Sequence, residues 1–224
     1  PTLEFQARRA ALIQELGAEG SGVFLAPSGE GTSDGRTFRQ ADDFWYLTGL
    51  EVPRSVLALD AESGAVTLFM PERDPRFESA TRPNDFPGRP LASDPSLAER
   101  SGITSVRGIR ELPDVLRRWI DRGRTLWVNP GRAGPVPTPN PDDPWDEIDS
   151  FTRFLRSLPD EPDDRSAFAP VARIRAVKSS AEIRTMRRAA ALTAAAIRDA
   201  ARSVRPGIDE RSIEAEFERG CKRG

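Results

Sequence analysis

Histidine is absent from this chain of 224 residues, and cysteine occurs only once, at Cys221. Without histidine, the chain cannot assemble a Ser-His-Asp or Cys-His catalytic group. A zinc site built from the usual histidine and cysteine ligands is excluded for the same reason, which leaves only an all-oxygen metal site as possible. A single cysteine cannot form an internal disulfide, and this is typical of cytoplasmic proteins.

Long apolar runs and an excess of charge of one sign are also missing. No apolar stretch approaches the roughly 20 residues of a membrane-spanning helix, and the first residues lack the basic and apolar parts of a secretion signal. The 33 basic and 35 acidic residues leave a formal charge of -2, so no basic field attracts nucleic acid or anionic lipid. We therefore expect a cytoplasmic protein that binds neither nucleic acid nor membranes.

The residues that are present predict an α/β domain. The composition, 38% hydrophobic and 30% charged, is typical of a globular protein. Apolar periodicity predicts an opening helix from Thr2 to about Leu16 and a later helix over residues 112–120. Strands are predicted at residues 23–26, 55–60, 65–70, 103–107 and 125–129, the second and third of them joined as a hairpin. This mixture of helices and strands predicts an α/β domain over residues 1–165.

A second segment, residues 166–224, is predicted to be helical. Residues 159–165 are acidic and contain no apolar side chain, so they are the predicted linker between the two parts. Ser179 and Glu182 have the spacing of a capping box and predict a helix that ends before Pro206-Gly207. Asp209 is predicted to cap a further helix. The first helix has one apolar face with no core of its own to cover, formed by Ile183, Met186, Ala190, Thr193, Ile197, Ala201 and Val204.

The run Phe38–Leu50 places fixed charges directly beside aromatic side chains. Its notable residues are Arg39, Gln40, Asp42, Asp43, Phe44, Trp45 and Tyr46, followed by Thr48-Gly49. Charges beside rings are partly desolvated and need one another as partners. One interpretation is that Arg39 pairs with Asp42 or Asp43 and fixes a strand and turn against the core. The other is a direct role in binding a substrate.

Together with Glu51-Val52-Pro53, this run resembles the signature of the N-terminal domain of Xaa-Pro aminopeptidases, the aminopeptidase P family. A second group of motifs resembles the beginning of the catalytic domain of the same peptidases. It consists of Arg173–Ser179, Glu182-Ile183, Met186–Ala190, Val204–Glu210 and Glu214–Phe217. Separated motifs in the family's order identify the chain as a member, although residues 71–170 match only loosely.

The resemblance implies a mixed sheet flanked by helices, of the creatinase and aminopeptidase P N-terminal type. Residues 166–224 would then be the first helices of a "pita-bread" catalytic domain. The family removes an N-terminal residue that precedes proline, at a dinuclear centre, commonly manganese, held by two Asp, one His and two Glu. These ligands lie beyond the matched motifs, so no catalytic or metal-binding residue is assigned here. We expect this chain alone to bind no metal and to be inactive.

The expected partners are proline-containing peptides, a homo-oligomer, and the missing catalytic domain, either in the same chain or as a second fragment. Asp34 matches a family aspartate that faces the substrate entrance, although an aspartate in a loop also commonly caps a turn. The structural motif candidates are Arg39, Gln40, Asp42, Asp43, Trp45 and Tyr46. A prolidase or creatinase-like hydrolase on the same scaffold, or a non-catalytic peptide-binding module, are the alternatives.

Overall fold

The computed structural model describes residues 2–28, 40–72, 94, 96–129, 155 and 164–223. The chain divides into two compact units, Pro1–Ile174 and Arg175–Gly224. Each unit is described by itself.

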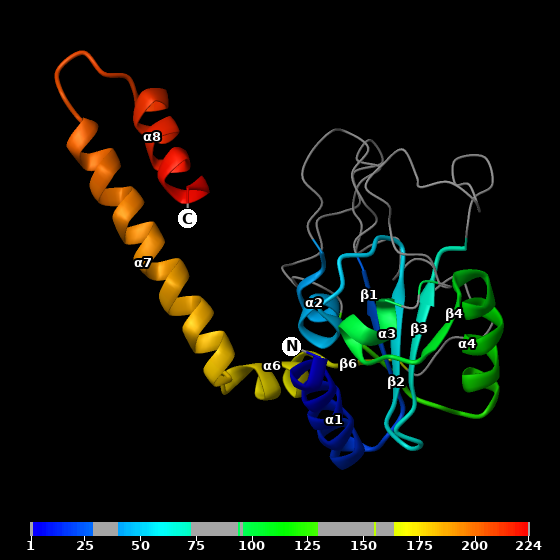
Figure 1. Ribbon diagram of the computed structural model, residues 1–224. Helices are drawn as coiled ribbons and strands as arrows, with labels where there is room; N and C mark the ends of the chain where they lie inside the picture. The colour runs from blue at the N-terminus through cyan, green and yellow to red at the C-terminus, as the bar shows by residue number, and fades with distance from the viewer. Residues whose placement is uncertain are drawn as a thin grey trace. The chain divides into compact units, whose positions relative to one another are not determined.

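The first unit is built on a six-stranded mixed sheet in the order β4-β3-β2-β1-β5-β6 (Figure 1). The strands are β1 (Val23–Pro27), β2 (Val56–Asp60), β3 (Val66–Met70), β4 (Ser105–Gly108), β5 (Leu126–Val128) and β6 (Asp164–Ser166). β2 runs antiparallel to both β1 and β3, which confirms the predicted hairpin, and every other neighbouring pair is parallel. The prediction of an α/β fold with a mixed sheet is therefore confirmed.

Helices cover both faces of this sheet. They are α1 (Thr2–Glu19), α2 (Asp42–Thr48), α3 (Ser96–Ser101), the short 3-10 helix η1 (Ile109–Glu111) with α4 (Leu112–Asp121), and α6 (Phe168–Ala176). In β1, Phe24 and Ala26 belong to a core cluster shared with α1, α2, α3 and α6. Val23 and Leu25 belong to a second cluster that includes α4. Burial on both faces explains why β1 is a continuous apolar run without alternation.

One local expectation is wrong, and another concerns residues that are only partly described. The segment around Asp42 and Asp43 forms the first turn of helix α2 instead of a strand and turn; acidic side chains are favourable in the first turn of a helix, where they meet its positive dipole end. Of the predicted linker, residues 159–163 lie outside the described residues, whereas Asp164 and Arg165 pair with β5 as the edge strand β6. The division between the two compact units falls after Ile174, and the predicted domain boundary at residue 165 stays a prediction.

The second unit contains α7 (Ser180–Ser203) and α8 (Glu210–Lys222). The capping box is confirmed: the Glu182 backbone N–H donates to Ser179 Oγ at 3.1 Å, and the Ser179 N–H donates to Glu182 Oε2 at 2.8 Å. Asp209 caps α8 by accepting from the Ser212 N–H at 2.7 Å. Both predicted caps are therefore present.

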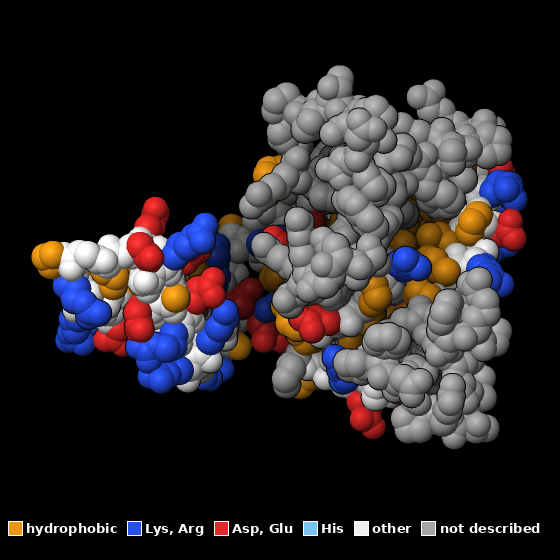
Figure 2. Space-filling model, turned by 90° about the horizontal axis from the view of Figure 1, so that it is seen from above, with side chains coloured by type: hydrophobic (Ala, Val, Ile, Leu, Met, Phe, Trp, Pro, Cys, Tyr) orange, Lys and Arg blue, Asp and Glu red, His pale blue; other side chains and the backbone are white. Residues whose placement is uncertain are grey.

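The helices α7 and α8 pack against each other, and the side chains that they bury fully are small. Within these two helices, only Ala196 and Ala200 are buried. Three large apolar side chains of α7 are exposed: Ile183, Met186 and Ile197 are 38%, 56% and 55% exposed, and Val204, which follows the helix, is 59% exposed. Figure 2 shows apolar side chains of this unit among interspersed acidic and basic ones. In the described part of the chain, no helix is both long and apolar enough to cross a membrane.

Candidate functional site

Within the described part of the run Phe38–Leu50, Asp42–Thr48 form α2 and Gly49 is its C-terminal cap. Gly49 has a φ of 65°, in the left-handed region, and its N–H donates to the Trp45 carbonyl at 2.8 Å. The buried Thr48 hydroxyl donates to the Phe44 carbonyl at 2.7 Å and accepts from the Leu50 N–H at 3.1 Å. A glycine in this conformation is a common way to end a helix. The Thr-Gly pair is therefore explained by the end of the helix.

Gln40 ties the chain that enters α2 to the chain that leaves it. Its side chain is buried, and Nε2 donates to the carbonyl oxygens of Leu50 at 3.2 Å and Val52 at 3.0 Å. Its Oε1 accepts from the Ala41 N–H at 2.9 Å. The amide group is neutral, and both its N–H donors and its oxygen are hydrogen-bonded, so it can fix a loop without burying a charge. In this structure, Gln40 stabilises the conformation of the motif.

Two arginines of α1 hold the same motif, and the sequence interpretation missed both. Arg9 is buried, and its guanidinium donates to the Leu47 carbonyl at 2.7 Å and to the Ser101 carbonyl at 2.9 Å. Burial lowers the pKa of Arg9 to about 10, so the group stays charged at neutral pH. Its position three and seven residues before Leu12 and Leu16, on the apolar face of α1, was the available signal.

Arg8 lies against the aromatic part of the motif. Its guanidinium carbon lies 4.2 Å from the centroid of the Tyr46 ring, and Nη1 donates to the Tyr46 carbonyl at 3.0 Å. Nη2 pairs with Glu4 at 2.7 Å. A cation stacked on a ring adds electrostatic attraction to ordinary packing. Arg8 thus connects α1 to α2.

The predicted motif residues point in different directions. Asp43 Oδ2 accepts from Asn129 Nδ2, at the end of β5, at 2.5 Å. Asp42 is exposed, and Trp45 is 45% exposed. The hydroxyl of the buried Tyr46 donates to the Ile174 carbonyl of α6 at 3.1 Å. Asp34 and Arg39 lie outside the described residues, so their roles stay predictions.

The described residues do not fit a dinuclear metal centre. No group of three or more His, Cys, Asp or Glu side chains in residues 2–28, 40–72, 96–129 and 164–223 is arranged to hold a metal ion. Carboxylates such as Glu15, Glu19 and Asp60 are instead paired with arginines. We therefore derive no chemical step through a metal in this part of the protein.

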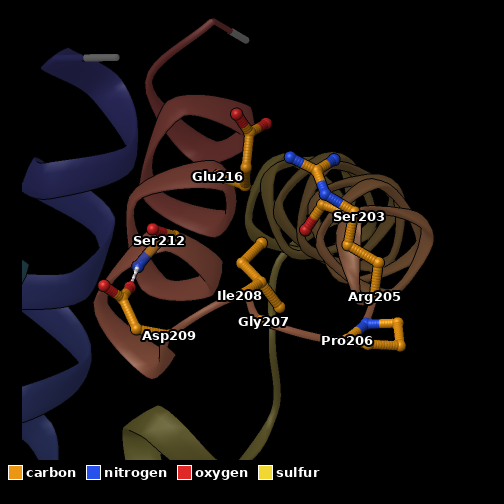
Figure 3. A pocket seen from close by; sticks show the side chains of 8 residues that line it. All are labelled: Ser203, Arg205, Pro206, Gly207, Ile208, Asp209, Ser212 and Glu216. Carbon is orange, nitrogen blue, oxygen red and sulfur yellow. Dashed lines mark hydrogen bonds between the residues drawn. The ribbon is translucent and has the colours of Figure 1, made fainter.

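A hollow of about 380 Å³ lies in the second unit, at the turn between α7 and α8 (Figure 3). Its lining residues are Ser203, Arg205, Pro206, Gly207, Ile208, Asp209, Ser212 and Glu216. The Asp209 carboxylate caps α8, the Ser203 hydroxyl donates to the Ala200 carbonyl at 2.7 Å, and Glu216 pairs with Arg219. These polar groups are therefore engaged in hydrogen bonds and an ion pair within the two helices. They do not provide a nucleophile paired with a general base.

The fold and the motif together define an aminopeptidase P N-terminal domain. The family model for "Aminopeptidase P, N-terminal domain" matches residues 5–127, which is more than half of the chain. The chain belongs to this family.

Curated relatives are similar over almost the whole chain. The Xaa-Pro aminopeptidase of Escherichia coli is 27% identical over 223 residues, covering 96% of this chain and 47% of the relative. A probable Xaa-Pro aminopeptidase PEPP of Paracoccidioides brasiliensis is 30% identical over 222 residues, covering 96% of this chain and 42% of the relative. The chain spans less than half the length of these relatives.

Solved structures show the same architecture. Aminopeptidase P from E. coli with the inhibitor Pro-Leu has a TM-score of 0.68 at 26% identity, covering 100% of this chain and 49% of that one. Proline aminopeptidase P II from Yersinia pestis has a TM-score of 0.68 at 24% identity, covering 100% of this chain and 50% of that one. The likeness includes the helical segment after the sheet, as the sequence predicted.

Proposed function

We propose that this chain is the N-terminal part of a metal-dependent Xaa-Pro aminopeptidase, which releases the N-terminal residue preceding a proline. The observation that carries the proposal is the family match over residues 5–127, continued by similarity to Xaa-Pro aminopeptidases over 96% of the chain. One related E. coli structure holds the inhibitor Pro-Leu, and another is a Zn-substituted enzyme in complex with product. A divalent metal, manganese in our proposal, therefore belongs to the whole protein.

Within that enzyme, we assign a supporting role to this part. The contacts of Gln40, Thr48 and Gly49 stabilise a scaffold, and the described residues bring together no catalytic group. We propose that this part shapes the substrate entrance, with Asp34 as the candidate residue, and contributes to a homo-oligomer. The catalytic portion, in the same chain or as a second fragment, would cover the exposed apolar face of α7.

The proposal is tested by comparing the whole protein with residues 1–224 alone. Both are incubated with a tripeptide that has proline second, and release of the first residue is followed by chromatography alongside metal analysis by mass spectrometry. We expect the whole protein to cleave the tripeptide, to lose activity with a chelator and to regain it with Mn²⁺. We expect residues 1–224 alone to hold no stoichiometric metal and to release nothing.

Two further substrates separate the alternatives. Preference of the whole protein for an Xaa-Pro dipeptide would identify a prolidase, and hydrolysis of creatine would identify a creatinase-like enzyme. A whole protein that cleaves none of these would contradict the proposed function. Cleavage by rigorously purified residues 1–224 would contradict the supporting role of this part.

A further inference from the structure

Helix α7 has a long side that its neighbour in the second unit does not cover. α8 has 13 residues and lies along the C-terminal part of α7, which has 24 (Figure 1). Within α7, only Ala196 and Ala200 are buried, while the larger side chains of Ile183, Met186 and Ile197 are exposed. Exposed apolar side chains that recur along one helix mark a surface that another part of a protein covers.

Two arginines lie within this exposed side. Six residues follow one another at intervals of three or four and therefore share one face of α7; they are Ile183, Arg187, Ala190, Ala194, Arg198 and Ala201, and we call them the arginine row. Arg187 and Arg198 are about 16 Å apart along the helix axis. Both side chains are exposed. In the part of the chain that the structure describes, neither guanidinium has an ion pair or a hydrogen bond.

The acidic side chains of the second unit do not neutralise these arginines. Lys and Arg outnumber Asp and Glu in residues 175–224. Most of the carboxylates are engaged elsewhere, as helix caps or in ion pairs with other basic residues: Glu182, Asp199, Asp209, Glu216 and Glu218. The other two, Glu210 and Glu214, are on α8. Negative charge opposite the arginine row therefore has to come from outside these two helices.

Covering the arginine row would remove Arg187 and Arg198 from water. A buried charge without a partner is costly, whereas a carboxylate at hydrogen-bond distance offsets much of the lost hydration. Ala190 and Ala194 are small, so the covering element can approach the helix closely between the two arginines. A second copy of α7 does not meet the requirement, because its own arginine row brings more positive charge and no carboxylate.

We propose that the exposed side of α7 is the docking surface for the catalytic portion of the whole protein, and that this portion presents one carboxylate to Arg187 and another to Arg198. The chain spans less than half the length of its curated relatives, so a whole protein of their length has a further portion to supply both groups. The inference rests on the proposed function and adds to it the charge of the part that covers α7.

Hydrogen exchange of the α7 amides tests whether the surface is covered. We expect the amides of residues 186–198 to exchange at least about tenfold more slowly in the whole protein than in residues 1–224 alone, because docking suppresses local opening. The β1 amides are the internal reference and should exchange equally in both. Equal rates for α7 in the two proteins would overturn the proposal. So would protection in residues 1–224 alone that increases with protein concentration, since that result assigns the surface to a second copy.

Charge reversal tests the carboxylates. In the whole protein, Arg187→Glu with Arg198→Glu should raise α7 exchange to the rate of residues 1–224 alone, because each glutamate then faces a carboxylate. Arg187→Lys with Arg198→Lys keeps the charges and should retain most of the protection. In residues 1–224 alone, both variants should leave exchange and helix content unchanged, which shows that α7 still folds.

Arg184→Glu is the matched control. Arg184 is also exposed and lies on α7 outside the arginine row, so its reversal should keep the protection of α7 in the whole protein. The proposed carboxylates are excluded if the double glutamate variant behaves like Arg184→Glu. Exchange is measured without substrate, so the two proposals fail separately: a whole protein that protects α7 but cleaves no Xaa-Pro peptide contradicts the proposed function alone.

Discussion

Arg9 shows how a buried cation is accommodated by backbone groups. Its two hydrogen bonds end on carbonyls in the last turns of α2 and α3. Carbonyl groups at a helix C-terminus carry partial negative charge, so they stabilise a nearby cation. The guanidinium in turn satisfies two carbonyl groups that the helices leave without partners. One side chain thus fixes the ends of two helices.

Replacing this side chain is expected to be costly. Arg9→Met keeps much of the volume but leaves both carbonyls unsatisfied in the core, so we expect a loss of about 2–4 kcal/mol in the free energy of unfolding, measured with urea. The control is Arg117→Met, since the Arg117–Asp114 pair is on the surface and such pairs contribute little. Equal stabilities of the two variants would refute the role given to Arg9.

Asp60 makes stability depend on pH. Burial alone would raise the pKa of its carboxyl, but hydrogen bonds from Arg124, the Glu62 N–H and Ser63, with the Arg124 charge, together lower this pKa below its ordinary value. The Arg124 Nη2–Asp60 Oδ1 distance is 2.6 Å. A carboxyl with a lowered pKa contributes stability above its unfolded pKa of about 3.9 and loses that contribution as the pH falls through the folded value.

Asp60→Asn is therefore expected to reduce the free energy of unfolding by about 1–3 kcal/mol at pH 7. The difference from the unmodified protein should shrink as the pH falls below about 4, where the unfolded carboxyl begins to bind a proton, and should be smallest once the pH is below the lowered pKa of the native carboxyl. Urea titrations between pH 7 and pH 2 measure this difference. Glu62→Gln, at an exposed partner of the same Arg124, should have a smaller effect. A difference that stays constant with pH would argue against the charged pair.

At the scale of elements, the close approach of α1 and α2 depends on Gly49. Gly49 and Gly64 both have positive φ, 65° and 70°. A Cβ on Gly49 would lie 2.3 Å from the Phe5 ring, whereas a Cβ on Gly64 would meet nothing within 4 Å. The two glycines therefore share a backbone requirement and differ in packing.

This difference gives a matched pair of variants. Gly64→Ala is expected to cost about 1 kcal/mol for the left-handed backbone, and Gly49→Ala about 2–4 kcal/mol because overpacking is added. Thermal and urea unfolding measure both. If the packing explanation holds, the excess cost at Gly49 disappears in a Phe5→Ala background; persistence of the full excess there would exclude it.

The elements that the sequence predicted correctly are those long enough to show a repeating pattern of apolar residues, or those marked by a strong local signal such as a turn or a cap. α1 and α4 have apolar stripes, the β2–β3 hairpin has a short polar turn, and Ser179 and Glu182 define a capping box. α2, α3 and β6 have only 7, 6 and 3 residues, too few to establish a period. Their conformation is stabilised by contacts with distant residues, such as those of Arg9 with α2 and α3.

At the scale of the whole molecule, the two units differ in how they are stabilised. The first has two core clusters, one on each face of the sheet. In the described part of the second, the seam between α7 and α8 buries only the side chains of Ala196 and Ala200. At this seam, a Cβ on Gly220 would lie 2.7 Å from the Cβ of Ala196, whereas a Cβ on Gly17 in α1 would meet nothing within 4 Å. The same substitution is therefore expected to have opposite effects in the two units.

Gly17→Ala should stabilise the first unit by about 0.5–1 kcal/mol through helix propensity. Gly220→Ala gains the same propensity but separates α7 from α8, so we expect a net loss of about 1–2 kcal/mol confined to the second unit. Hydrogen exchange resolves the two units, with β1 amides reporting on the first and α8 amides on the second. Faster exchange of β1 in Gly220→Ala would contradict the division into separately stabilised units.

The sequence by itself determined the class of fold, the long helices and their caps, and the family, because these depend on local periodicity and on motifs that lie close together in the chain. It also excluded histidine-based chemistry within these residues. Only the tertiary structure decided what the aromatic motif contacts. The partners of Gln40, Tyr46 and Asp43 include residues up to 128 positions away, and no local pattern specifies such contacts. Arg9 and Asn129 were missed for the same reason. They lie far from the motif in the sequence, and they come within hydrogen-bond distance of its carbonyl and carboxylate groups only in the folded domain.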